Sequence, residues 1–64
     1  MIKTFTVEEQ FSDMRIDRYI KKAIKDIPQG LIEKSLRNGK IKLNYKKVKS
    51  SQRVQIRANL IFYN

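Results

Sequence analysis

The spacing of hydrophobic residues changes once along the chain, from every three or four residues to every second residue. In residues 15–25 apolar side chains recur on one helical face, with basic residues on the others, which predicts an amphipathic helix. Pro28 interrupts this pattern and suits the first turn of a second helix, which we expect to run to about Asn38. Gly39 then stands where a left-handed helix cap usually occurs. We expect the first helix to bury one apolar stripe, formed by Ile16, Ile20, Ala23, Ile24 and Ile27. We expect the second helix to bury Leu31, Ile32, Ser35 and Leu36.

The remaining segments have the two-residue period of β-strands. Residues 40–44 alternate strictly between polar and aliphatic side chains and predict a strand with Ile41 and Leu43 facing inward. A polar turn is expected at residues 44–47, and Val48 then resumes the buried face. Val54 and Ile56 alternate with polar residues, which predicts a second strand with both inside. Residues 2–7 predict a short strand at the other end of the chain. The expected fold class is therefore α+β: two packed, helix-turn-helix-like helices against a small, mainly antiparallel sheet.

Two local features remain open at this level. Ser12 and Asp13 are both suitable caps for the first helix. The apolar run at residues 60–63 has two interpretations: a last strand inserted into the sheet, or a chain cut from something longer.

Composition bounds the chemistry of the chain. Its 64 residues form one domain at most, and 41% of them are hydrophobic, which is enough for a small core. The chain has no cysteine and no histidine, which removes thiolate ligands, the commonest general base and the commonest metal ligand. We therefore expect no metal, no cofactor and no catalysis by this chain alone. No apolar run reaches a membrane-spanning length, so we expect a cytoplasmic protein without a membrane partner. We also expect the protein to be monomeric.

The distribution of charge indicates the kind of partner. The net charge is +9, with −2 in residues 1–14 and +11 in residues 15–64. So dense a basic excess predicts a polyanion, with nucleic acid as the first candidate and an anionic membrane surface as the second. A generic solubilising surface is the plain alternative, but solubility needs much less charge.

The order of these elements resembles the RNA-binding domain named after ribosomal small-subunit protein S-four. The resemblance covers roughly residues 15–61 and rests on an Arg-hydrophobic-Asp opening, a Leu-Ile pair and a Gly-x-hydrophobic-x-hydrophobic-Asn strand. These motifs are Arg15-Ile16-Asp17 with Tyr19-Ile20, then Leu31-Ile32, then Asn38-Gly39-Lys40-Ile41-Lys42-Leu43-Asn44, and finally Lys47-Val48.

The N-terminal flank narrows the resemblance to pseudouridine synthases of large-subunit ribosomal RNA. Residues 5–10, 15–20 and 26–34 are similar to the beginning of those enzymes, in which this module precedes a larger catalytic domain. The resemblance implies a single RNA-binding domain over residues 1–64, as the N-terminal fragment of a longer isomerase that modifies ribosomal RNA. The chain itself is expected to target that catalytic domain to structured RNA.

Three positions depart from the family pattern. Tyr45 stands where glycine usually follows Asn44, which weighs against a two-residue hairpin. Gly30 replaces a Ser or Thr that commonly starts the second helix. Arg57-Ala58 replaces a Gly-Asp turn, so we expect a different entry to the final strand.

The basic residues are the candidate binding site. The resemblance places RNA on the start of the first helix, the second helix and the following strand, and backbone contacts rather than base readout are expected. Asp17 lacks the flanking His and Thr-Ser-Gly of the catalytic motif and is interpreted as structural. The remaining alternatives are a DNA-binding helix-turn-helix and a basic module for membranes or proteins. The predicted RNA-binding residues are Arg15, Gln29, Gly30, Lys34, Arg37, Lys40 and Lys42.

Overall fold

A three-stranded antiparallel sheet and two helices make up the fold. The computed structural model describes residues 2–63. The last strand in sequence lies at the centre of the sheet, whose order is β1-β3-β2. The expected α+β class is confirmed, including the insertion of the apolar run at residues 60–63 into the sheet. The elements are β1 (Ile2–Thr6), a 3₁₀ turn η1 (Glu9–Phe11), α1 (Ile16–Ala23), α2 (Gln29–Asn38), β2 (Ile41–Leu43) and β3 (Asn59–Tyr63).

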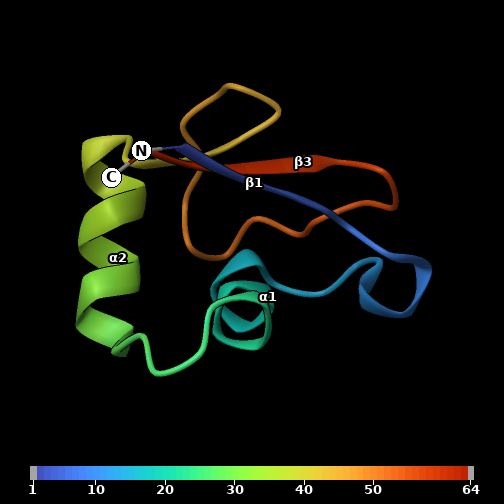
Figure 1. The fold of residues 1–64 in the computed structure, drawn as a ribbon, viewed down its shortest axis with the longest axis horizontal. Helices are drawn as coiled ribbons and strands as arrows, with labels where there is room; N and C mark the ends of the chain where they lie inside the picture. Colours follow the sequence, from blue (N-terminus) through green and yellow to red (C-terminus); the bar gives the residue numbers. More distant parts are fainter. Residues whose placement is uncertain (1, 64) are drawn as a thin grey trace.

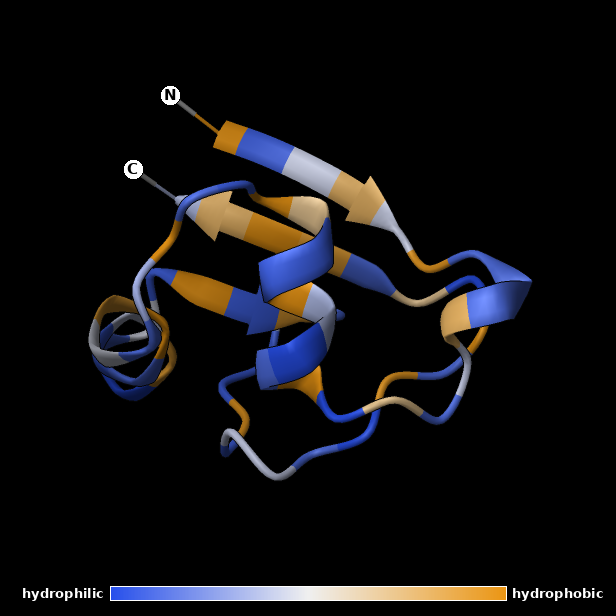
Figure 2. Cartoon of the chain, turned by 90° about the horizontal axis from the view of Figure 1, so that it is seen from below, coloured by the Kyte–Doolittle hydropathy of each residue, from blue (hydrophilic) through white to orange (hydrophobic). Residues whose placement is uncertain are grey.

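Both helices lie on one side of the sheet region, in different orientations. Figure 1 shows α1 end-on below the sheet and α2 upright beside it. Figure 2 shows α1 crossing in front of the strands, with α2 seen end-on. In the sheet, Leu60 of β3 pairs with Phe5 of β1 and with Leu43 of β2. These three side chains share one face because directly opposed residues in a sheet point to the same side.

The core forms where the helices meet this face of the sheet. The predicted stripe of α1 contributes two fully buried isoleucines, while Ala23, Ile24 and Ile27 pack at its margin. The inner face of α2 is buried as predicted except for Leu31, which is 47% exposed. Leu31 lies at the edge of this face, 100° from Ile32 and 140° from Leu36, one turn before the buried Ser35. The core residues are Val7, Ile16, Tyr19, Ile20, Ile32, Leu36, Ile41, Leu43, Val54, Ala58 and Leu60.

The start of α1 differs from the expectation. Arg15, not Ser12 or Asp13, is the residue before the first helical one, and its side chain makes no capping bond. Asp17 takes over this role from within the first turn, where its carboxylate accepts the Arg18 N–H at 2.8 Å. A carboxylate here satisfies a free donor and is favoured by the helix dipole.

The ends of α2 follow the sequence closely. Pro28 precedes the first helical residue with φ −67° and ψ 149°, which its ring favours. Gly39 adopts the left-handed conformation, φ 78°, and the chain ends the helix there. The Lys40 N–H donates to the Ser35 carbonyl at 2.9 Å, which completes the cap and directs the chain into β2.

The hairpin after β2 is tighter than Tyr45 led us to expect. Leu43 and Lys46 exchange two backbone hydrogen bonds of 3.0 Å, so the turn contains only two residues, Asn44 and Tyr45. Both have positive φ, 50° and 67°. Tyr45 in place of glycine therefore does not prevent the two-residue turn, contrary to the expectation. The tyrosine adopts a left-handed backbone conformation, which costs any residue other than glycine about 1 kcal/mol or more.

The second strand predicted from the alternation at Val54 and Ile56 is wrong. Most of this segment is a loop that returns along the helices, and Ile56, expected inside, is 44% exposed. Val54 is buried as expected, but it pairs with the chain before α1: the Val54 carbonyl accepts the Asp13 N–H at 2.7 Å. Arg57, at φ 69°, then completes a tight turn into β3 without glycine. The alternation of polar and apolar residues could not distinguish this isolated pairing, a bridge between Arg15 and Arg53, from a strand of the main sheet.

Candidate nucleic-acid interface

The outer face of α2 carries a column of three predicted RNA-binding residues. Gly30, Lys34 and Arg37 are spaced by four and three residues, so they follow one another along the helix surface. All three are exposed. A Cβ atom built on Gly30 would meet no heavy atom within 4 Å, so the helix backbone is open at this point. The column therefore offers two cations beside an accessible stretch of main chain.

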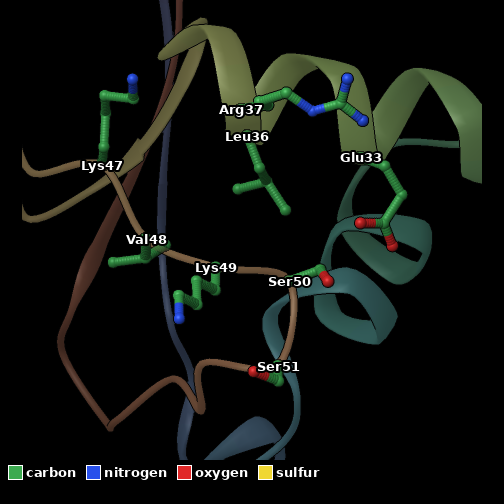
Figure 3. Close-up of a pocket in the computed structure, with 8 residues that line it drawn as sticks. All are labelled: Glu33, Leu36, Arg37, Lys47, Val48, Lys49, Ser50 and Ser51. Carbon is green, nitrogen blue, oxygen red and sulfur yellow. The ribbon is translucent and has the colours of Figure 1, made fainter.

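A groove separates the end of α2 from the loop that follows the hairpin. It has a volume of about 560 Å³ (Figure 3). Leu36 points from α2 toward the loop, and Arg37 and Lys47 lie on opposite sides of the groove. Three cations and two hydroxyl groups on an apolar floor are the groups that hold a phosphodiester backbone. We call it the α2 groove; its lining is Glu33, Leu36, Arg37, Lys47, Val48, Lys49, Ser50 and Ser51.

One carboxylate opposes the cations of the α2 groove. Glu33 lines it and accepts a 2.8 Å hydrogen bond from the side-chain amide of Gln29, one turn earlier on α2. Gln29, predicted to contact RNA, is therefore already bonded to a neighbour. The negative charge of Glu33 lowers the attraction of the groove for phosphate.

A second basic hollow, of about 630 Å³, lies beside α1. It brings together Arg15 and Gln29, two predicted residues that are 14 positions apart in sequence. The approach of α2's first residue to α1's polar face places them there. We call it the α1 hollow; its lining is Arg15, Asp17, Arg18, Lys21, Lys22 and Gln29.

The arginine of the α1 hollow is fixed by an ion pair. The Arg15 guanidinium donates through Nε and Nη2 to the two carboxylate oxygens of Asp17, at 3.2 and 3.1 Å. The Asp17 side chain is 10% exposed and that of Arg15 is 44% exposed. Two parallel bonds define the plane of the guanidinium, whose Nη1 remains outside the pair. Asp17 thus both begins the helix and orients Arg15.

The two lysines of the β2 segment are placed differently from each other. Lys40 is exposed just before the strand. Lys42 is half-buried, and its ammonium nitrogen lies 5.5 Å from the centre of the Tyr63 ring, within range of a cation–π contact. The stems of Lys42 and Lys47 both pass Gly39, where a Cβ would meet each at 3.4 Å. The positive charge of β2 is therefore directed toward the end of α2.

The predicted residues thus lie at several places on the surface and do not form one continuous row. Arg15 and Gln29 belong to the α1 hollow, and Arg37 to the α2 groove; Gly30 and Lys34 lie on the α2 face. The prediction omitted cations of both hollows. Those of α1 could have been found from their helical spacing beside Arg15, whereas the loop residues had no local signal. The omitted residues are Arg18, Lys21, Lys22, Lys47, Lys49, Ser50 and Ser51.

Other kinds of chemistry have little support in the described part of the chain. Within residues 2–63, no three His, Cys, Asp or Glu side chains form a metal-binding group. No helix there is long and apolar enough to cross a membrane. Tyr19 is the titratable group that its environment changes: burial, and then the charge of Glu8, raise the pKa of its hydroxyl. Tyr19 packs edge-on against Phe11 in the core and lies outside both lysine-rich hollows.

Comparison with known proteins points to enzymes that modify ribosomal RNA. No family model matches the chain. It is 32% identical over 50 residues to ribosomal large subunit pseudouridine synthase C of Buchnera aphidicola, covering 78% of this chain and 16% of that protein. The Haemophilus influenzae protein of the same name is 32% identical over 54 residues, covering 84% and 17%. The Vibrio parahaemolyticus protein is 29% identical over 49 residues, covering 77% and 16%.

The chain is therefore similar to a short N-terminal region of these synthases. It spans about one-sixth of the length of the curated relatives it matches.

Proposed function

We propose that residues 1–64 form an RNA-binding domain that holds structured large-subunit ribosomal RNA through the outer face of α2, the α2 groove and the α1 hollow. The observation that carries the proposal is the convergence of two cation-lined hollows on the two ends of one helix. Gln29 at the start of α2 lines the α1 hollow, and Arg37 at its end lines the α2 groove. α2 has 10 residues, so about 15 Å separate its ends.

This spacing fits a nucleic-acid backbone better than a small anion. Successive phosphates along one strand are several ångströms apart, so a strand that follows α2 meets the α1 hollow, Lys34 and the α2 groove in turn. Arg37, Lys34 and the groove lysines are free of ion pairs within 4.0 Å among residues 2–63. Free cations release counterions when they bind phosphate, and this release supplies most of the affinity.

We further propose that the domain delivers a pseudouridine synthase catalytic domain to its ribosomal RNA substrate. The support is the similarity to synthases of which this chain matches about 16%. The chain supplies no histidine or cysteine. Its Arg15-Ile16-Asp17 motif is used internally, because Asp17 is bonded to Arg15 and to the Arg18 N–H. The isomerisation itself therefore belongs to the other part of such an enzyme.

Parallel binding titrations test the proposal. The purified 64-residue chain is titrated with a large-subunit ribosomal RNA stem-loop, a DNA duplex of equal length and vesicles of anionic phospholipid at one salt concentration. We expect the RNA to bind at least tenfold more tightly than the DNA. Equal affinity for the three polyanions, or a preference for vesicles, would refute RNA as the partner.

A further inference from the structure

The tip of the β2 hairpin carries an exposed aromatic ring in an unfavourable backbone conformation. Tyr45 is 67% exposed and has φ 67°. Five residues other than glycine have positive φ in the described chain, and three are Asp or Asn, which tolerate this conformation. The other two are Tyr45 and Arg57.

Asn44, its neighbour in the turn, has an internal role that Tyr45 lacks. The Asn44 side-chain oxygen accepts a hydrogen bond from the Asn59 backbone N–H at 2.9 Å. The Asn44 backbone N–H donates to the Asn59 carbonyl at 2.8 Å, and the two bonds fix the hairpin to β3. Tyr45 makes no side-chain hydrogen bond, aromatic pair or cation–π contact with any residue from 2 to 63. The fold thus gains nothing visible from this ring, although glycine would occupy its position without strain.

A strained residue that the fold does not use is a candidate for function. Tyr45 immediately precedes Lys46 and Lys47, and Lys47 lines the α2 groove. The turn that carries the ring therefore leads directly into one side of the α2 groove. Every base has a flat face that stacks on an aromatic side chain, but in a continuous duplex these faces are covered by neighbouring bases.

We propose that Tyr45 stacks on an unpaired base of the RNA, so that the domain prefers a helix interrupted by a bulge or internal loop over an uninterrupted duplex. This inference rests on the proposed RNA-binding function and names the substrate class of the same site. The lysines after the turn hold the phosphates that flank the unpaired nucleotide, and the ring covers its base.

The test compares two RNAs that differ by one nucleotide. The full chain is titrated with an RNA duplex and with the same duplex carrying one bulged adenosine, so that ends and length are matched. Stacking predicts a preference of about 5- to 150-fold for the bulged RNA. Tyr45→Phe should retain this preference, whereas Tyr45→Leu and Tyr45→Gly should abolish it and leave duplex affinity nearly unchanged.

Arg57→Gly is the matched control because it relieves the same kind of strain without removing an aromatic ring. Both glycine variants should raise the unfolding temperature, by about 2–8 °C for a domain of this size. Only Tyr45→Gly should lose the bulge preference. Equal affinity of the wild-type chain for the bulged RNA and the uninterrupted duplex would overturn the inference. A preference for the bulged RNA that Tyr45→Leu retains would also overturn it.

Failure of this inference is distinguishable from failure of the proposed function. If the duplex binds and Arg37→Ala weakens it, but the bulge adds nothing, only the stacking role of Tyr45 is refuted. If neither RNA binds, or if anionic vesicles bind more tightly than both RNAs, both proposals are refuted.

Discussion

The α1 hollow and the α2 groove carry similar side chains but hold them in different ways. In the α1 hollow, Arg15 is bonded through two nitrogens to Asp17, so its charge is partly neutralised and its direction is fixed. In the α2 groove, Arg37 and Lys47 have no such carboxylate partner within residues 2–63, and Glu33 is bonded to Gln29. The first region therefore supplies orientation, and the second supplies electrostatic attraction that salt weakens.

Both regions depend on one small core, and its loss has the largest expected effect. Ile20 is a core residue of α1, the helix whose polar residues line the α1 hollow, and Leu36 forms the floor of the α2 groove; both are at most 2% exposed. Substitution of either by alanine should cost about 2–5 kcal/mol of unfolding free energy, measured by urea denaturation. Loss of either should abolish both regions together, because a domain this small unfolds cooperatively. A cost below about 0.5 kcal/mol for Leu36→Ala would show that the two regions do not share a core.

The next prediction separates the fixed arginine from the free one. Arg15→Ala leaves the nearly buried Asp17 carboxylate with only the Arg18 N–H, and we expect a loss of about 1 kcal/mol, since Arg15 is itself half-exposed. Arg37→Ala should stay within about 0.5 kcal/mol because its side chain is exposed. Urea denaturation of both variants measures the difference. Adding Asp17→Asn to Arg15→Ala should restore part of the loss; equal stability of the two single variants would contradict the distinction.

The carboxylate of the α2 groove gives a smaller effect of opposite sign on binding. Glu33→Gln removes a negative charge from among the groove cations, and RNA affinity should rise by about two- to fivefold, measured by fluorescence anisotropy. Glu9→Gln makes the same change of charge in η1, outside both hollows, and serves as the control. An equal gain from Glu9→Gln would show that total charge, and not the groove, governs affinity.

The smallest expected effect concerns the core tyrosine and alkaline pH. Burial raises the pKa of Tyr19 above its ordinary value of 10.0, so the folded state keeps this proton after the unfolded chain has lost it. Stability is then complete below pH 10 and falls as pH rises toward the folded pKa. Tyr19→Phe should remove this component, so its stability should fall less steeply than that of wild type above pH 10. Parallel curves for the two proteins in urea denaturation would contradict the prediction.

The sequence predicted those parts of the fold that short-range rules determine. The periods of the two helices and the left-handed Gly39 appear as expected, because each depends on a few adjacent residues, whereas Pro28 lies one residue before α2 and not in its first turn. The segment after the hairpin was predicted wrongly because Val54 pairs with the chain near Asp13, 41 positions away, and no local pattern records that pairing. The tight turn at Tyr45 was missed because the bonds of Asn44 to β3 enforce it.

The candidate site was predictable in part for the same reason. The outer residues of α2 follow from helical spacing, and their column is found in the structure. The α2 groove requires Lys47, Lys49 and two serines from a loop that returns to α2, and that return is a tertiary feature. The RNA-binding role of all these residues stays a prediction.

The most direct test is the salt dependence of RNA binding for the wild-type chain and two matched variants. If the five predicted cations Arg15, Lys34, Arg37, Lys40 and Lys42 each meet one phosphate, the slope of log affinity against log salt lies between roughly −3.5 and −4.5. Arg37→Ala should flatten this slope by slightly under one unit, as expected for one lost contact. Lys25→Ala, which removes the same charge two residues after the end of α1 and outside both hollows, should leave the slope unchanged. Equal flattening by the two variants would contradict a localised RNA surface on α2.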